Sequence, residues 1–163
     1  MKAPSFQSSY PETTRHCYGC GELNTQGLHI QSYWDGEETI CRFDPAPHHI
    51  AVPGYVYGGL IASIIDCHGT GSATAAAYRE SGRELGSEPP LRYVTGSLHV
   101  DYLKPTPLGV TLTARGVIHE VRGRVVVVRI SLSAESVVCA TGEVVAVRMP
   151  DEWLASLTDS GSG

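Results

Sequence analysis

The run from Gly58 to about Arg83 constrains the fold of this chain more than any other segment. Its sequence, GGLIASIIDCHGTGSATAAAYRESGR, is rich in alanine, contains no proline and opens on two adjacent glycines. A run of this length is enough for about six or seven helical turns. It is the only segment whose pattern predicts a long helix, so the rest of the fold has to be arranged around it.

Strand-like runs precede and follow this helix. Residues 27–43 form two such runs around Asp35 and Gly36, a dipeptide that supplies the positive φ angles of a tight hairpin. Between residues 91 and 150 lie four more runs that are rich in valine and are separated by short connections. Short connections favour antiparallel neighbours. The pattern is therefore two strands, one helix and then four strands.

One helix cannot cover both faces of a six-stranded antiparallel sheet, so the sheet should wrap around it and leave other surfaces for a second subunit. This α+β arrangement, with the sheet around one long central helix, is the hotdog fold. We expect an irregular N-terminal arm over residues 1–26, a single domain over 27–150 and a flexible C-terminal tail over 151–163.

The composition excludes several classes of protein. A net charge of −5 over 163 residues does not favour nucleic acid as a partner. No apolar run approaches the roughly 20 residues of a membrane span, and the N-terminus lacks the apolar core of a secretory signal. We therefore expect a cytoplasmic protein with no membrane partner.

The five cysteines do not predict a disulfide framework, because their number is odd and most are scattered. Cys17 and Cys20 stand at C-x-x-C spacing, which suits a shared metal or a redox bond. A zinc site needs about two more ligands, and the next cysteine along the chain is Cys41. The sequence favours a buried structural turn and no metal, with metal or redox chemistry as the alternative.

The two sides of the predicted helix differ in character. At about 100° per residue, the large apolar residues share one arc, which should face the sheet: Leu60, Ile61, Ile64 and Ile65. His68 falls near the edge of this arc and should be a partly buried histidine with its hydrogen bonds met. The opposite side carries small or polar residues: Gly59, Ala62, Ser63, Asp66, Gly69, Thr70, Ala73 and Ala77.

Asp66 is the only charged residue of the helix before Arg79. An ordinary solvated face would carry several Lys, Glu or Gln residues, so this bare acid favours a site over a plain exposed carboxylate. If the helix begins at Gly58, the amides of Gly58 and Gly59 are unpaired at its positive end and can stabilise an oxyanion. A carbonyl group could sit between these donors and the acid, which lies two turns further on.

Three segments resemble a known family. PGYVYGGLIASIID resembles the P-G-x-x-H-G-G...D signature of hotdog-fold acyl-CoA thioesterases of the phenylacetate-pathway branch. LHVDYLKPTPLG resembles the aromatic-x-(Arg/Lys)-Pro-x-Pro-x-Gly turn that follows it in the family, and CYGCGELNTQGLHI is similar to an N-terminal CxGCG segment of one subgroup. The resemblance spans about residues 17–148.

The resemblance implies hydrolysis of a CoA thioester at a dimer interface. Asp66 takes the place of the general base or nucleophile, and Gly58 with Gly59 takes the place of the oxyanion donors. Relatives place a Ser or Thr seven residues before the strand tyrosine to orient the water from the other subunit, which corresponds to Thr95. CoA is part of the substrate, and no cofactor is implied.

Tyr57 departs from the family pattern, because relatives have histidine before the two glycines. A phenol does not take up a proton near neutral pH, but it can donate a hydrogen bond that positions the thioester carbonyl. His49 lies upstream and could replace lost polar contacts, although a structural role is the commoner one for such a histidine.

The substrate-binding candidates are basic. Arg122 and Arg124 lie in a turn that resembles the basic turn near the CoA phosphates of relatives, and Lys104 is a further candidate. A solvated hairpin turn is the alternative for both arginines. Strand alternation also predicts one polar face on residues 95–101, with Thr95, Ser97, His99 and Asp101, which could line an interface between dimers.

The leading hypothesis is an acyl-CoA thioesterase that acts as a homodimer or a dimer of dimers. The alternative is a hotdog module that binds an acyl-CoA or another apolar ligand without turning it over.

Overall fold

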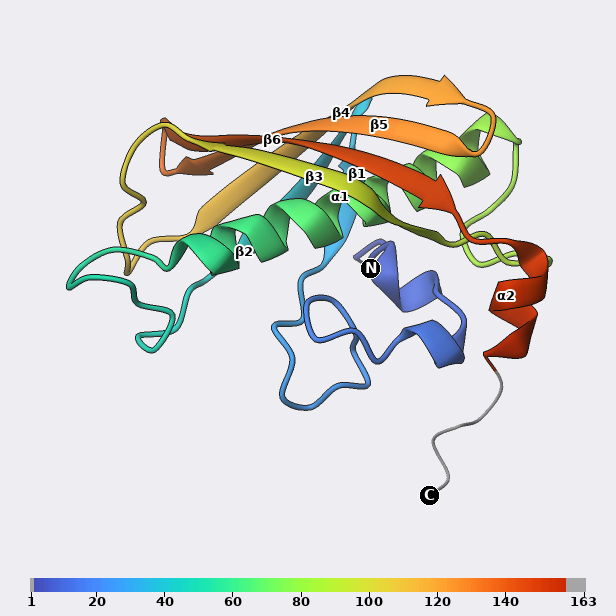
Figure 1. Ribbon diagram of the computed structural model, residues 1–163, viewed down its shortest axis with the longest axis horizontal. Helices are drawn as coiled ribbons and strands as arrows, with labels where there is room; N and C mark the ends of the chain where they lie inside the picture. The colour runs from blue at the N-terminus through green and yellow to red at the C-terminus, as the bar shows by residue number, and fades with distance from the viewer. Residues whose placement is uncertain (1, 158–163) are drawn as a thin grey trace.

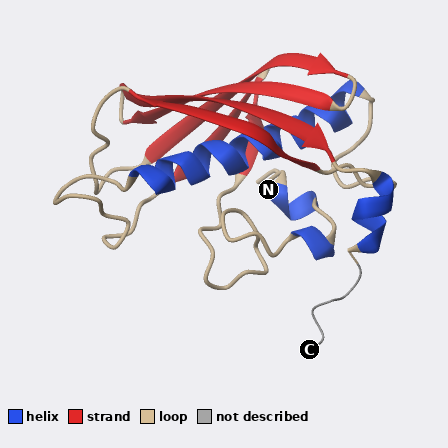
Figure 2. Ribbon diagram, viewed as in Figure 1, coloured by secondary structure: helices blue, strands red, loops and turns tan. Residues whose placement is uncertain are grey.

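A single antiparallel sheet wraps around one long helix. The computed structural model describes residues 2–157. The helix is α1 (Gly58–Glu80), and the strands are β1 (Ser32–Asp35), β2 (Glu38–Phe43), β3 (Tyr93–Tyr102), β4 (Leu112–Arg122), β5 (Val125–Ala134) and β6 (Val137–Arg148). Their order in the sheet is β1-β2-β4-β5-β6-β3, with every neighbouring pair antiparallel (Figure 1, Figure 2). This confirms the α+β hotdog arrangement expected from the sequence.

Helix α1 crosses the concave face of the sheet (Figure 1). Its four large apolar residues are buried as predicted: Leu60, Ile61, Ile64 and Ile65. The helix ends at Glu80, three residues before the expected end, because Gly82 adopts a φ of 66° that does not continue a helix.

The opposite side of α1 is open only over its first turns. Gly59, Ala62, Ser63 and Asp66 are partly exposed, whereas Gly69, Thr70 and Ala73 are buried. A Cβ on Gly69 would stand 2.5 Å from Cγ2 of Val144 in β6. The small or polar side predicted from the sequence is therefore not accessible along its whole length, because the curved sheet covers Gly69, Thr70 and Ala73.

The N-terminal arm packs against the domain. It forms two short 3-10 turns, Gln7–Ser9 and Glu12–Thr14. Phe6 and Tyr10 are buried, and the amide of Phe6 donates to the carbonyl of Ser32 at 2.9 Å. The arm therefore covers part of α1 and β1.

A buried polar network joins the arm, the sheet and the helix. His68 is fully buried; its Nδ1 lies 2.8 Å from Ser32 Oγ and its Nε2 lies 3.1 Å from Thr39 Oγ1. Ser32 Oγ accepts from Gln7 Nε2 at 3.1 Å, and Thr39 Oγ1 lies 2.7 Å from Ser72 Oγ. The prediction of a core histidine with both hydrogen bonds met is confirmed, with complete burial in place of partial burial.

The region predicted as a flexible C-terminal tail begins with a short helix, α2 (Asp151–Ser156). Pro150 precedes the helix, and two acids occupy its first turn, where negative charge is favourable. Asp151 also pairs with Arg148 at 3.1 Å. The expected tail was wrong over these residues, while residues 158–163 lie outside the described part. Within residues 2–157, no helix is both long and apolar enough to cross a membrane.

Strand β3 contains a bulge that corrects the predicted polar face. The pairing with β6 shifts register between Thr95 and Ser97, around Gly96. Thr95 pairs with Ala146, which is buried against the helix, whereas Ser97 pairs with Val145 on the other face. Thr95 therefore does not share a face with Ser97, because the inserted residue breaks the alternation.

Ser97, His99 and Asp101 remain on the outer face of the sheet, away from α1. His99 and Asp101 line a shallow hollow there together with Arg115, Arg129 and Glu143. The outer face is thus the polar surface that the sequence predicted, but without Thr95.

Candidate active site

The start of α1 presents two backbone donors. The carbonyl of Tyr57 accepts from the amides of Leu60 and Ile61, at 3.1 and 3.4 Å. Among the described residues, the amides of Gly58 and Gly59 have no hydrogen-bond acceptor. They lie at the positive end of a 23-residue helix, which is where an oxyanion is stabilised.

Two tyrosines enclose these glycines. The ring of Tyr57 covers Gly59, where a Cβ would stand 2.3 Å from Cε1 of the ring. The hydroxyl of Tyr102 donates to the carbonyl of Gly58 at 2.7 Å, and its ring lies 3.4 Å from the position of a Gly58 Cβ. Each glycine leaves room for a ring, so the glycines allow the two aromatic side chains to approach the helix backbone.

Tyr102 is a further candidate site residue, which was not predicted from the sequence. In the sequence it only fixed the position of Thr95, which lies seven residues before it. The signal for it is alternation along β3, because Tyr102 pairs with the fully buried Ala140 and therefore points toward the helix.

Asp66 and Thr95 form a direct contact within one chain. Thr95 Oγ1 donates to Asp66 Oδ1 at 2.5 Å. Asp66 is half-buried in the third turn of α1, and Thr95 is exposed on β3 just before the bulge. The hydroxyl fixes one carboxylate oxygen and leaves the other free to accept a proton.

The acid and the amides do not meet on one substrate carbonyl within one chain. Gly59 precedes Asp66 by seven residues, which is about 10 Å along a helix. A carbonyl and an attacking water, each in a hydrogen bond of about 3 Å, do not comfortably span this distance. The sequence-based picture of a carbonyl held between them therefore requires another arrangement.

Lys104 is the predicted cation that lies near the glycines. It lines a hollow of about 240 Å³ together with Gly58, Ile61 and Tyr102. Its backbone amide donates to the carbonyl of Cys139 at 3.1 Å, which fixes the chain after β3. Lys104 therefore lies beside the start of α1.

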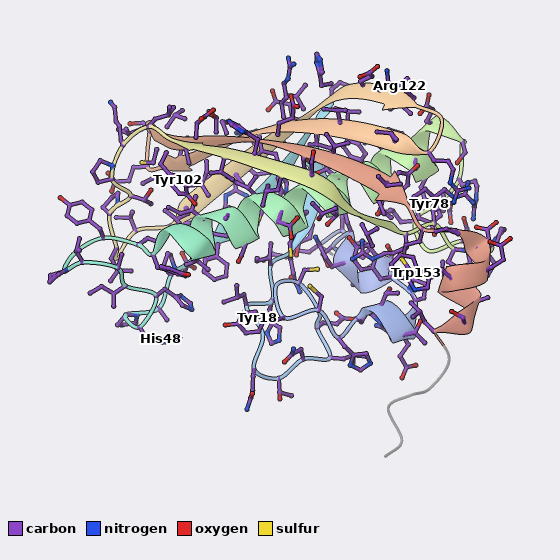
Figure 3. All side chains as sticks on the ribbon, viewed as in Figure 1. Tyr18, His48, Tyr78, Tyr102, Arg122 and Trp153 are labelled. Carbon is purple, nitrogen blue, oxygen red and sulfur yellow. The ribbon has the colours of Figure 1, made fainter. Side chains whose placement is uncertain are left out.

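Arg122 and Arg124 lie toward the other end of the molecule. They flank the β4–β5 turn, which lines a hollow with Glu80 at the end of α1. Figure 3 shows Arg122 and Tyr102 at opposite ends of the molecule. Arg122 lies 3.6 Å from Glu120, and Arg124 donates to the carbonyl of Arg148 at 3.3 Å. One chain therefore does not bring these arginines to the glycines.

His49 supports the loop that leads into α1. Its Nδ1 accepts from the amide of Ala46 at 2.9 Å, and its carbonyl accepts from the amide of Tyr57 at 2.9 Å. Burial lowers the pKa of His49, and the neighbouring His48 lowers it further. A neutral ring with Nδ1 occupied orders this loop and leaves only Nε2 for a ligand.

One protein-family model matches the part of the chain that contains most of these residues. The model described as "Thioesterase superfamily" matches residues 53–141, which include both glycines, Asp66 and Thr95. Over 85 residues, the chain is 31% identical to acyl-coenzyme A thioesterase THEM4 of Xenopus laevis and to its namesake of Rattus norvegicus. Those residues are 52% of this chain and 32% and 31% of the two relatives, so the chain matches about a third of their length.

Solved structures show the same fold. A thioesterase superfamily protein from Shewanella loihica PV-4 is 51% identical, covers 88% of this chain and 99% of its own, and superposes with a TM-score of 0.67. PaaI from the phenylacetic acid degradation operon of E. coli is 17% identical, with a TM-score of 0.61 over 76% of this chain and 81% of its own. The second likeness concerns the fold alone.

Proposed function

The chain belongs to the thioesterase superfamily, and on this premise we propose that it hydrolyses an acyl-CoA thioester to a free acid and CoA. Two observations on α1 carry the proposal together. The Asp66 carboxylate accepts a hydrogen bond from Thr95 of β3, and the first amides of the same helix, at Gly58 and Gly59, have no acceptor in the described structure. These are the two components that acyl transfer requires, a base or nucleophile and an oxyanion site.

The proposed reaction uses Asp66 to accept a proton from water. The water oxygen attacks the thioester carbonyl carbon, and the resulting oxyanion accepts hydrogen bonds from the Gly58 and Gly59 amides. The C–S bond then breaks, and CoA leaves as a thiolate that takes up a proton. Direct attack by the Asp66 carboxylate, followed by hydrolysis of the anhydride, uses the same groups.

Tyr57 takes over the position of the family histidine in this proposal. Its ring lies over Gly59 and is 58% exposed, so its hydroxyl is free to donate to the thioester carbonyl. A phenol donates without carrying a charge, which suits a positioning role beside the oxyanion amides.

We propose that two copies of the chain form one site. Within one chain the amides and Asp66 are about 10 Å apart, whereas a second copy can bring its own Asp66 close to the glycines. Large apolar side chains are exposed around the start of α1 and along the inner face of β3: Ile50, Val52, Tyr55, Tyr57, Leu98, Tyr102 and Leu103. Covering them would contribute to a stable dimer.

The same pairing is needed for the CoA phosphates. Lys104 lies near Gly58 of its own chain. Arg122 and Arg124 of a second copy would then bind a phosphate of the CoA that extends out of the shared site. Arginine binds phosphate in a two-pronged geometry, which is why these exposed residues are our candidates. A dimer of dimers through the outer face of the sheet is compatible with this arrangement.

The oligomeric state tests this part of the proposal. We expect the purified chain to sediment with about twice its chain mass of 17.4 kDa, or about four times if the outer face also pairs. Replacing the exposed Leu103 and Val52 with lysine should shift it toward the monomer and lower activity in parallel. A monomer that retains full activity would rule out a shared site.

The activity itself is tested with a panel of acyl-CoAs of short, medium, long and aromatic acyl groups. We expect release of free CoA, measured with a thiol reagent, for at least one class and in proportion to enzyme. The rival, a non-catalytic binding module, is favoured by Tyr57 in place of the family histidine. Tight binding with every ester recovered intact would establish the rival and overturn the hydrolase.

A further inference from the structure

Three cysteines meet beneath α1 in a cluster that the proposed hydrolysis does not use. Cys17 and Cys20 come from the N-terminal arm, and Cys67 comes from α1, immediately after Asp66. Their three sulfur atoms all lie within 4.8 Å of one another, and none is in a disulfide. Cys20 and Cys67 are buried, whereas Cys17 is exposed. Figure 3 shows sulfur atoms gathered where the loop carrying Tyr18 meets the helix.

The loop between the first two cysteines is shaped around the sulfurs. A Cβ on Gly19 would stand 2.4 Å from Cys67 Sγ, and a Cβ on Gly21 would stand 2.4 Å from the amide nitrogen of Cys17. Both positions therefore require glycine. The carbonyl of Gly19 accepts from the amide of Ile30 at 3.0 Å, which fixes the loop to the chain that leads into β1.

The three sulfur atoms are close enough to share one cation. Each lies within 4.8 Å of the other two, and a cysteine binds a metal through its thiolate. A cation at the centre of the cluster would therefore be held by all three side chains.

A buried positive charge stands nearby. Arg92 is 8% exposed, and its guanidinium lies 4.0 Å from the ring centre of Tyr10. Arg92 is close enough to Cys20 for its charge to interact with this side chain. Three thiolates and a divalent cation carry a net charge of −1, which the single charge of Arg92 offsets.

We propose that Cys17, Cys20 and Cys67 form a three-thiolate site for a thiophilic cation, and that this cation is Zn²⁺. Zinc–sulfur bonds of about 2.3 Å place the sulfurs of one site about 4 Å apart, within the spread of this cluster. Among the described residues, no fourth His, Cys, Asp or Glu joins the group. The exposed Cys17 side therefore leaves a fourth position for water or another small ligand. Each cysteine that is a thiol before Zn²⁺ binds releases its proton on binding.

The fold overturns the reason for expecting no metal. That expectation rested on the distance along the sequence from Cys20 to Cys41, but Cys41 lies outside the cluster and the helix supplies Cys67 instead. The site ties the N-terminal arm to α1 beside the candidate acid. Zinc should therefore stabilise the folded chain without taking part in the reaction.

Zinc content of the full chain, purified under reducing conditions, tests the proposal. We expect about one Zn²⁺ per chain by elemental analysis, and a thiolate-to-metal charge-transfer absorption when Co²⁺ replaces it. Cys17→Ser, Cys20→Ser and Cys67→Ser should each lose both signals. Cys41→Ser and Cys139→Ser remove buried thiols outside the cluster and should retain both.

Cys17→Ser keeps the test decisive if the buried variants fail to fold, because Cys17 is exposed. Added Zn²⁺ should raise the Tm of the metal-free wild type and leave that of Cys17→Ser unchanged. The proposal is overturned if the reduced wild type takes up no zinc and all five thiols react freely. It is also overturned if Cys41→Ser loses zinc equally, or if the fresh protein contains a Cys17–Cys20 disulfide. None of these readouts depends on thioester hydrolysis.

Discussion

Asp66→Asn should lower kcat for acyl-CoA hydrolysis by about 10²- to 10⁴-fold, the usual contribution of a positioned general base. Asparagine has nearly the same shape as aspartate, and its amide oxygen can still accept the hydrogen bond from Thr95. The variant therefore keeps the local structure but can neither take a proton from water nor attack the thioester. Steady-state kinetics with the best acyl-CoA of the panel, at matched circular dichroism spectra, measures the effect.

Asp101→Asn is the matched control. Asp101 lies on the outer face, 3.1 Å from Nε2 of the exposed His99, and does not face α1. Its replacement should leave kcat within about twofold of the wild type, because it changes only an exposed contact of little value. Equal rates for Asp66→Asn and Asp101→Asn would remove Asp66 from the mechanism, even if the wild type hydrolyses acyl-CoA.

His68 should make the fold sensitive to acid, with a loss of about 3 kcal/mol of unfolding free energy between neutral pH and pH 4. Burial lowers the pKa of His68 from 6.5 to about 4, and the contact with Thr39 acts in the opposite direction. The unfolded chain therefore takes up a proton below about pH 6.5, while the folded chain resists it. The contribution of neutral His68 to the unfolding free energy is fully present above about pH 6.5 and is lost as the pH falls toward 4.

His68→Gln tests this prediction because glutamine hydrogen-bonds without ionising. Urea unfolding at pH 7 and pH 4, with chelator present so that metal release does not contribute, gives the free energies. The variant should be less stable than the wild type at pH 7 but should lose about 3 kcal/mol less on acidification. His119→Gln, at an exposed position on β4, should behave like the wild type. Parallel pH profiles for His68→Gln and the wild type would contradict the assignment.

Local patterns were sufficient to predict the main elements. The alanine-rich run after two glycines gave the start of α1 at Gly58, and the four large apolar residues gave its buried arc. Valine-rich runs with short connections gave six antiparallel strands. These features are set by neighbours along the chain, so periodicity can report them.

Patterns failed where distant segments meet. The bulge at Gly96 reverses the alternation of β3 and turns Thr95 toward Asp66, which a strict period of two places on the outer face. The second half of the small-residue side of α1 is covered because Gly69 lies against Val144. Both outcomes depend on the curvature of the sheet around the helix.

The sequence by itself determined the fold class, the start of the helix at Gly58 and the types of group that the proposed hydrolysis needs, because each follows from local propensity and spacing. Only the tertiary structure decided which groups meet. It joined Thr95 to Asp66, separated Arg122 and Arg124 from the glycines, and brought Cys67 to Cys17 and Cys20. The reason is physical: side chains far apart in sequence become neighbours only through packing of the sheet and arm on α1, and no period along the chain encodes that approach.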